Sequence, residues 1–163
     1  MNTRTEFHQN SPRQRILSEG HDDVGLAGEL AFLAWAEELA VGQDTHKLLP
    51  GGDPGWDAVT PVGTVDVKTA RRPFYLLREY ARAVQADILV LAHYRGPGKD
   101  VRLMGWEWSF VLLACQVKEH GHGIKNHQLK QDQLQSMGKL KLLMQGLPLC
   151  DRWADIHQEQ QGD

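Results

Sequence analysis

Alternating hydrophobic and polar residues mark a β-hairpin in the middle of the chain. Residues 56–69 read Trp-Asp-Ala-Val-Thr-Pro-Val-Gly-Thr-Val-Asp-Val-Lys-Thr. Because side chains alternate between the two faces of a strand, this pattern predicts strands over residues 56–59 and 64–69. The break at residues 60–63 has turn chemistry, since Pro fixes one dihedral and Gly permits a positive one. In the second strand, the polar face carries Thr64, Asp66 and Lys68.

An earlier segment, residues 26–41, is apolar almost all round, which predicts a largely buried helix. Asp22 or Asp23 would cap its start and Gly42 would end it. Glu29 lies among apolar helical neighbours, where an unpaired carboxylate is costly. A backbone group or an Arg can satisfy it near the helix start, or it can face a metal ion; the acids downstream favour the second interpretation.

The rest of the chain alternates between strand and helix patterns, which predicts an α/β fold. Glycine and proline in residues 50–55 indicate a loop that leads to Asp57. Gly105 predicts a bend in its strand. The expected elements are strands over residues 45–49, 86–94, 101–106 and 126–130, helices over residues 73–84 and 109–118, and a final helix after residue 130.

Composition narrows the class of protein. The 163 residues predict a single domain over residues 24–150, between a polar N-terminal segment (1–23) and a polar tail (151–163). No apolar run approaches the roughly 20 residues of a membrane span, and the N-terminus lacks the apolar core of a secretory signal, so we expect a cytoplasmic protein without a membrane partner.

The side chains with candidate chemistry outside the hairpin have simpler interpretations. Cys115 and Cys150 lack metal-type spacing and are expected to be free thiols. The histidines of residues 120–127 lie in a glycine-broken segment that is a poor zinc site and is better explained as a polar loop. The net charge of −3 argues against a generally basic nucleic-acid binder, although a local basic patch remains compatible with it.

The hairpin itself carries the strongest candidate chemistry. If its strands pair as expected, Asp57 and Asp66 converge at one end of the sheet with Lys68 beside them. Two carboxylates repel each other unless a hard cation lies between them, and Mg²⁺ favours one or two carboxylates plus waters. A neighbouring Lys can then orient water or stabilise charge on a phosphate.

These residues resemble the motif of the PD-(D/E)xK nuclease superfamily, in which an acid on one strand is followed by acid-x-Lys on the next. The corresponding positions are Asp57 and Asp66-Val67-Lys68, and Glu29 fits the glutamate that many members add from the preceding helix. Trp56 stands where the family often has proline. The resemblance covers about residues 25–106, and its relatives include phage and bacterial proteins.

The resemblance implies a restriction-endonuclease-like core, which is a central mixed sheet flanked by helices, with the order αβββαββ. It implies a Mg²⁺- or Mn²⁺-dependent deoxyribonuclease in which Asp57, Asp66 and the Val67 carbonyl hold the metal, with Glu29 completing the set. Lys68 would position the attacking water. Just past the motif, Arg71 and Arg72 would contact the DNA backbone. The partner is then DNA, with a possible homo-oligomer, in the host cytoplasm if the protein is phage-encoded.

Two other classes of protein fit the same sequence. One is a nucleic-acid-binding or regulatory module on this fold without turnover. The other is a protein-interaction domain that exposes Trp106 and Trp108 in an apolar patch. For these aromatics, anchoring the following helix to the sheet is the simpler expectation, and stacking on bases is the alternative. Gln85 at the end of the expected helix is a weaker candidate for assisting the site.

Overall fold

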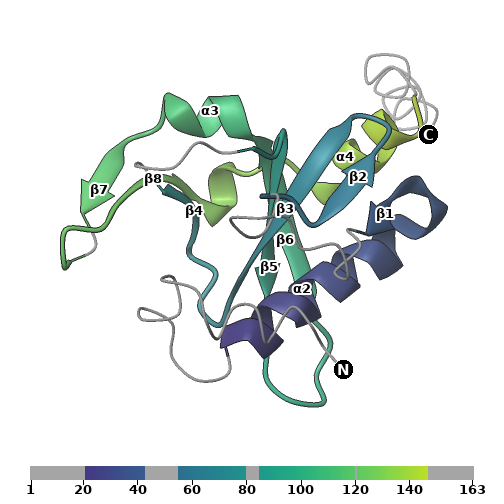
Figure 1. The fold of residues 1–163 in the computed structure, drawn as a ribbon, viewed down its shortest axis with the longest axis horizontal. Helices are drawn as coiled ribbons and strands as arrows, with labels where there is room; N and C mark the ends of the chain where they lie inside the picture. Colours follow the sequence, from purple (N-terminus) through teal and green to yellow (C-terminus); the bar gives the residue numbers. More distant parts are fainter. Residues whose placement is uncertain (1–20, 43–54, 80–84, 120, 147–163) are drawn as a thin grey trace, which may run out of the picture.

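A computed structural model describes residues 21–42, 55–79, 85–119 and 121–146 of the chain, and its elements form two β-sheets and several helices (Figure 1). The helices are α2 (His21–Ala36), α3 (Ser109–Leu113) and α4 (Met137–Met144), with 3-10 turns η2 (Glu37–Leu39) and η3 (Gln131–Gln133). The strands are β1 (Val41–Gly42), β2 (Ala58–Thr60), β3 (Gly63–Ala70), β4 (Tyr75–Glu79), β5 (Ile88–His93), β6 (Arg102–Trp108), β7 (Val117–Glu119) and β8 (Lys125–Lys130).

The main sheet is mixed. Its five strands lie in the order β1-β2-β3-β5-β6, with β3 and β5 parallel and the other pairs antiparallel. A second sheet of three antiparallel strands has the order β4-β8-β7. The chain is therefore of the mixed α/β class that the sequence predicts.

Each face of the main sheet packs on a different set of elements. One face contributes Val65, Val67 and Val90 to a core with Phe32 and Ala36 of α2 and Leu140 and Met144 of α4. The opposite face contributes Leu89 and Leu91 to a second core, which they share with Leu76 of β4 and Leu112 of α3. Accordingly, Figure 1 shows the small sheet on one side of the main sheet and α2 and α4 toward the other.

The predicted hairpin is confirmed. Strands β2 and β3 pair antiparallel with Thr60 opposite Gly63, leaving Pro61 and Val62 as a two-residue loop. Gly63 has φ +137°, a backbone conformation that L side chains rarely adopt. The pairing places Val59 opposite Thr64, so these two side chains share one face of the sheet.

The buried strand and its return are also confirmed. Residues Ile88 to Ala92 of β5 are all buried, as expected for a strand covered on both faces. β6 returns antiparallel, and the register shifts beside Gly105, where Leu134 packs so closely that an added Cβ would lie 2.7 Å from the Leu134 Cβ. At the start of α3, the Ser109 hydroxyl donates to the Ala86 carbonyl at 2.5 Å, which joins α3 to the beginning of β5.

The expected helix over residues 73–84 is wrong for the residues that the structure describes there. Residues 75–79 form β4, which pairs with β8. Phe74, which begins the apolar stripe of the expected helix, is 64% exposed, whereas Leu76 is fully buried. Pairing with β8 and the burial of alternate residues override the helical pattern, which is local and individually weak. The order αβββαββ is therefore not reproduced in the described part of this crossover.

The first helix lies earlier than predicted. It begins at His21, so Asp22 and Asp23 are within it and do not precede it. Regular α-helix ends at Ala36, since Glu37 adopts a left-handed φ of +53°. Gly42, expected to terminate this helix, belongs to β1 and pairs with Ala58.

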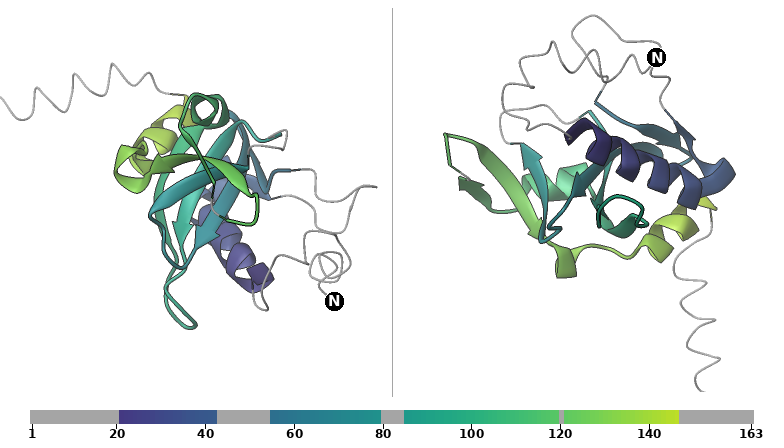
Figure 2. Two further views of the ribbon diagram at one scale, coloured as in Figure 1. Left: turned by 90° about the vertical axis from the view of Figure 1, so that its left-hand side faces the viewer. Right: turned by 90° about the horizontal axis from the view of Figure 1, so that it is seen from below.

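The C-terminal elements differ from expectation in extent. The helix after β6 ends at Leu113 instead of continuing to residue 118, because the backbone of residues 116–119 pairs with β8. β8 is the middle strand of the small sheet and not an edge strand. The β7–β8 hairpin projects from the rest of the fold (Figure 2), and the predicted final helix is α4.

Several expected features lie outside the described residues. They are the strand at residues 45–49, residues 50–54 of the loop before Asp57, the polar segments 1–20 and 151–163, and Cys150. Within the described ranges, none of the helices has both the length and the apolar character needed to cross a membrane.

Candidate functional site

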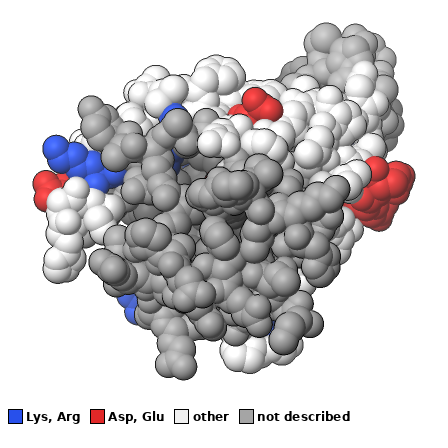
Figure 3. All heavy atoms as spheres, viewed as in Figure 1, with Lys and Arg blue, Asp and Glu red and all other residues white. Residues whose placement is uncertain are grey.

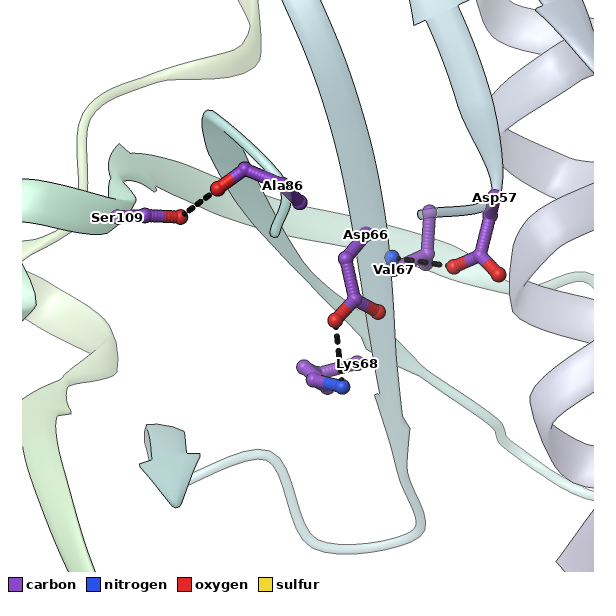
Figure 4. Close-up of polar contacts among 6 residues, drawn as sticks. All are labelled: Asp57, Asp66, Val67, Lys68, Ala86 and Ser109. Carbon is purple, nitrogen blue, oxygen red and sulfur yellow. Dashed lines mark hydrogen bonds and ion pairs between the residues drawn. The ribbon is translucent and has the colours of Figure 1, made fainter. Parts of the chain in front are cut away.

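Asp57 lies immediately before β2 and forms hydrogen bonds with the two residues on either side of Asp66. Its backbone N–H donates to the Val65 carbonyl at 2.7 Å, and its Oδ2 accepts a hydrogen bond from the Val67 N–H at 2.7 Å. Asp57 is only 8% exposed. The hairpin therefore places Asp57 beside the backbone of β3 at Asp66, with the Asp57 carboxylate directed at the Val67 N–H (Figure 4).

Asp66 and Lys68 point the same way from β3, as alternation along a strand requires. The Lys68 Nζ lies 2.6 Å from the Asp66 Oδ2 (Figure 4). The Asp66 side chain is 18% exposed and the Lys68 side chain 48%, so this ion pair is at the surface. In this view the Asp57 carboxylate and the Asp66–Lys68 pair lie on opposite sides of the β3 ribbon. Each aspartate thus has a different partner.

Glu29 lies on the helix that packs against β3. The close approach of α2 to β3 occurs next to it, where a Cβ on Gly28 would lie 1.8 Å from the Thr69 Oγ1. Glu29 is half-buried and makes a polar contact in the structure. Gly28 therefore sets the distance between the element that carries Glu29 and the strand that carries Lys68.

The sheet face that carries Asp66 and Lys68 is uncovered toward β1. The pairing of Val59 with Thr64 and of Val41 with Val59 places both valines on this face. Val59 is 48% exposed and Val41 70%. On the other side of β3, Leu89 and Leu91 of the same face are buried beneath β4 and α3. The Asp66–Lys68 pair thus lies at the border between the covered and the uncovered half.

The chemistry of the donors at the hairpin suits a hard cation, since two carboxylates and a backbone carbonyl are all oxygen ligands. Among the described residues, however, there is no group of three or more His, Cys, Asp or Glu side chains arranged to hold a metal ion. Mg²⁺ is commonly held by one or two carboxylates together with waters and substrate phosphates. At this hairpin, Asp57 and Asp66 are the two carboxylates that such a smaller set would use.

Arg71 and Arg72 follow β3 and are both exposed. The Arg71 guanidinium lies 5.8 Å from the centre of the Tyr94 ring, a distance suited to a cation–π contact. Figure 3 shows described Lys and Arg side chains in separate places, some of them on the side where Figure 1 places β7 and β8. The two arginines are thus available to solvent beside the candidate site.

The interpretation that Trp106 and Trp108 are exposed for a protein partner is wrong for Trp106. This ring is fully buried, and its Nε1–H donates to the Ser136 carbonyl at 2.9 Å. It packs edge-on against Trp108, which is half-buried. Trp106 therefore has a structural role, which agrees with the simpler expectation for these aromatic residues.

Two polar residues have a more specific place than their sequence context suggests. The Gln85 side chain packs against Gly55, where an added Cβ would lie 3.0 Å from the Gln85 Cβ, close to the loop that leads to Asp57. Arg78, within the range 73–84 where a helix was expected, is 8% exposed in β4. The run Phe74-Tyr75-Leu76-Leu77 before Arg78 contains the aromatic residues that strands favour, and this signal was available in the sequence.

The described part of the histidine-rich segment forms a turn over residues 121–124 and then enters β8. His127 lies in β8, is 7% exposed, and has its Nδ1 3.0 Å from the Cys115 carbonyl oxygen. Cys115 itself is a free, half-buried thiol, as predicted. Burial, and secondarily the negative charge of Glu107, raise the pKa of the Cys115 thiol.

Comparison with known proteins identifies no matching family model, no matching curated protein and no matching solved structure.

Proposed function

We propose that this chain is a divalent-metal-dependent deoxyribonuclease with a restriction-endonuclease-like core. The observation that carries the proposal is the position of Asp57. Asp57 forms hydrogen bonds with the residues before and after Asp66, and the Asp66 carboxylate contacts Lys68. Two acids and an ammonium thus belong to one hairpin, in the order along the chain that the nuclease motif has.

The architecture is compatible with this proposal. A mixed sheet has its motif hairpin beside a parallel β3–β5 pair, and a helix bearing Glu29 packs on the motif strand. The departure is β4, which occupies part of the crossover where the nuclease order has a helix. The site itself lies on β2 and β3, so this difference changes the flank of the site and leaves the hairpin intact.

Asp57, Asp66 and the Val67 carbonyl would hold Mg²⁺ or Mn²⁺, with Glu29 completing the set through a water, because no three acids of the described residues surround one position. A divalent ion bound there polarises a phosphoryl oxygen and lowers the pKa of a nearby water. The buried hydrogen bond from Val67 fixes the orientation of Asp57. Asp66 is engaged by Lys68, so cation binding by Asp66 competes with the ion pair and shifts the ammonium toward the substrate.

The remaining roles concern the DNA. Lys68, with a 48% exposed side chain, orients the attacking water and stabilises negative charge on the phosphate in the transition state. The exposed Arg71 and Arg72 contact the DNA backbone and position it without reading its sequence. Cytoplasmic location, and a homo-oligomer that holds a duplex, belong to the same proposal.

The direct test is cleavage of DNA by the full chain in Mg²⁺ or Mn²⁺, with chelator as the negative control. We expect Asp66→Asn and Lys68→Met each to lower the rate by about 10²-fold or more, as for the loss of a group that stabilises transition-state charge. The matched control is Asp100→Asn, which breaks the exposed Arg95–Asp100 ion pair elsewhere on the surface and should leave the rate unchanged. Equal cleavage by wild type and both site variants would remove the catalytic claim.

A second candidate function is nucleic-acid binding or regulation without turnover. The Asp66–Lys68 ion pair favours it, because an aspartate whose charge is neutralised by its own neighbour needs no cation. Calorimetric titration separates the two: binding of Mn²⁺ that Asp66→Asn abolishes supports the nuclease, and absence of binding at millimolar Mn²⁺ supports the module without turnover.

A further inference from the structure

The small sheet contains a buried arginine, two of whose guanidinium nitrogens have no hydrogen-bond partner. Arg78 of β4 is 8% exposed, and its Nε and Nη1 are buried with no hydrogen-bond partner. A guanidinium remains protonated in proteins, so burial cannot be relieved by loss of a proton. Because buried charges are normally paired and hydrogen-bonded, this arrangement calls for an anion.

The residue directly opposite Arg78 in the β4–β8 ladder is His127, which is 7% exposed. Residues opposite each other on antiparallel strands share a face, with Cβ atoms about 4.5–5.5 Å apart. Leu76, two residues before Arg78, is on the same face and belongs to the core beneath the small sheet. Arg78 and His127 therefore lie together on the inner side of the small sheet.

The carboxylates identified in the described core and at the hairpin are engaged elsewhere. Glu107 accepts from the Trp108 backbone N–H at 2.9 Å and from the Gln135 side chain at 2.8 Å. Asp66 contacts Lys68. The His127 Nδ1 faces the Cys115 carbonyl, which can only accept, so Nδ1 carries a proton. Arg78 and His127 thus lie side by side, and no acid of the residues that the structure describes forms an ion pair with Arg78.

We propose that Arg78 and His127 form a recognition site for a phosphomonoester group. Phosphate is the anion whose charge and several acceptor oxygens match the unpartnered donors of a guanidinium. The burial of both side chains excludes a phosphodiester in mid-strand, which carries a nucleoside on each side, whereas a terminal phosphate can enter end-on. The site lies on β4 and β8, away from the hairpin residues, and does not depend on nuclease chemistry.

The test uses the full chain in chelator, so that no metal-dependent reaction contributes. Inorganic phosphate should raise the melting temperature of wild type by about 3–6 °C at ten times its Kd, relative to chloride at the same ionic strength. Arg78→Met removes an unpaired buried charge, so it should melt higher than wild type without phosphate and show no phosphate-specific increase. The exposed control Arg72→Met should keep the increase.

A second measurement reports on the site in wild type alone. Phosphate should shift the ring signals of His127 in ¹H–¹⁵N spectra, while those of His93 and His122 stay in place. An oligonucleotide with a terminal phosphate that acts at lower concentration than inorganic phosphate identifies a nucleic-acid end as the source, and equal potency identifies a small phosphate ligand. Either result supports the site.

Three results would overturn it. They are a phosphate response in Arg78→Met equal to that of wild type, an absence of any phosphate-specific change in wild type by both measurements, and an Arg78→Met variant that is less stable than wild type or unfolded. The last would show that the guanidinium is satisfied without a ligand. Loss of nuclease activity in the hairpin variants leaves all three readouts unaffected, so the two proposals fail separately.

Discussion

The Oδ2 of Asp57 accepts a hydrogen bond of 2.7 Å from the backbone N–H of Val67, inside the hairpin that carries the candidate chemistry. This contact joins the residue before β2 to the central residue of the Asp66-Val67-Lys68 sequence. It gives Asp57 a structural role that can be separated from its proposed role in binding a cation.

Replacement of Asp57 should separate these two roles. Asp57→Ala leaves the Val67 N–H buried without an acceptor and should lower the free energy of unfolding by about 1–3 kcal/mol. Asp57→Asn keeps an acceptor oxygen, so its stability should stay close to wild type while DNA cleavage is lost. Urea unfolding and the cleavage assay measure the two effects. An Asp57→Asn variant as active as wild type would exclude the carboxylate from the reaction.

The Asp66–Lys68 ion pair should contribute little to stability. Lys68 has a 48% exposed side chain, and exposed ion pairs contribute about 0–1 kcal/mol. Lys68→Met should therefore unfold at nearly the wild-type urea concentration, yet bind Mn²⁺ more tightly, because the Asp66 charge is no longer neutralised. Calorimetry measures the affinity. Unchanged or weaker Mn²⁺ binding in Lys68→Met would show that Asp66 does not bind the cation.

Gly28 should tolerate no side chain, whereas Gly25 on the same helix should. An alanine Cβ at Gly28 would lie 1.8 Å from the Thr69 Oγ1, so α2 must move away from β3, at a typical overpacking cost of about 1–3 kcal/mol. Gly25 has no atom within 4 Å of such a Cβ. Gly25→Ala should therefore stabilise the helix by about 0.5–1 kcal/mol. Thermal unfolding of both variants checks the contrast, and a tolerated Gly28→Ala would refute the close helix–strand contact.

The Cys115 thiol should react slowly near neutral pH. Burial and the charge of Glu107 raise its pKa, so less thiolate is present at a given pH than in an exposed cysteine. In a Cys150→Ser background, the rate of alkylation should rise with pH to a midpoint above that of a model thiol. Glu107→Gln removes the negative charge and should lower the midpoint. A midpoint at or below the model value would contradict this environment for Cys115.

The hairpin was predictable from the sequence because its information is local. The alternation over residues 64–69 indicates the strand and which side chains share a face of it, and the turn residues between Pro61 and Gly63 indicate the turn. Neither depends on distant residues. The apolar run of β5 is equally explicit. The same local pattern predicts that Asp57 lies close to Asp66 along the hairpin. In the structure, Asp57 forms hydrogen bonds with the backbone of Val65 and Val67, the two neighbours of Asp66.

The errors fall where distant pairing decides the outcome. Residues 75–79 carry an apolar spacing compatible with a helix, and their pairing with β8, some fifty residues later, makes them a strand. For that reason the burial of Arg78 opposite His127 could not be foreseen from the sequence. The end of α2 at Ala36 depends on the backbone of Glu37 and on the β1–β2 pairing, neither of which the apolar pattern encodes.

The central claim is that Asp57 and Asp66 hold a divalent cation at the β2–β3 hairpin, and paramagnetic broadening by Mn²⁺ tests it most directly. In ¹H–¹⁵N spectra of the full chain, we predict that substoichiometric Mn²⁺ first broadens the backbone signals of Asp57, Asp66 and Val67, and that Asp66→Asn abolishes this selective effect. Broadening that begins at other acids, such as Asp100 or Asp132, or that leaves the hairpin signals sharp would contradict the account.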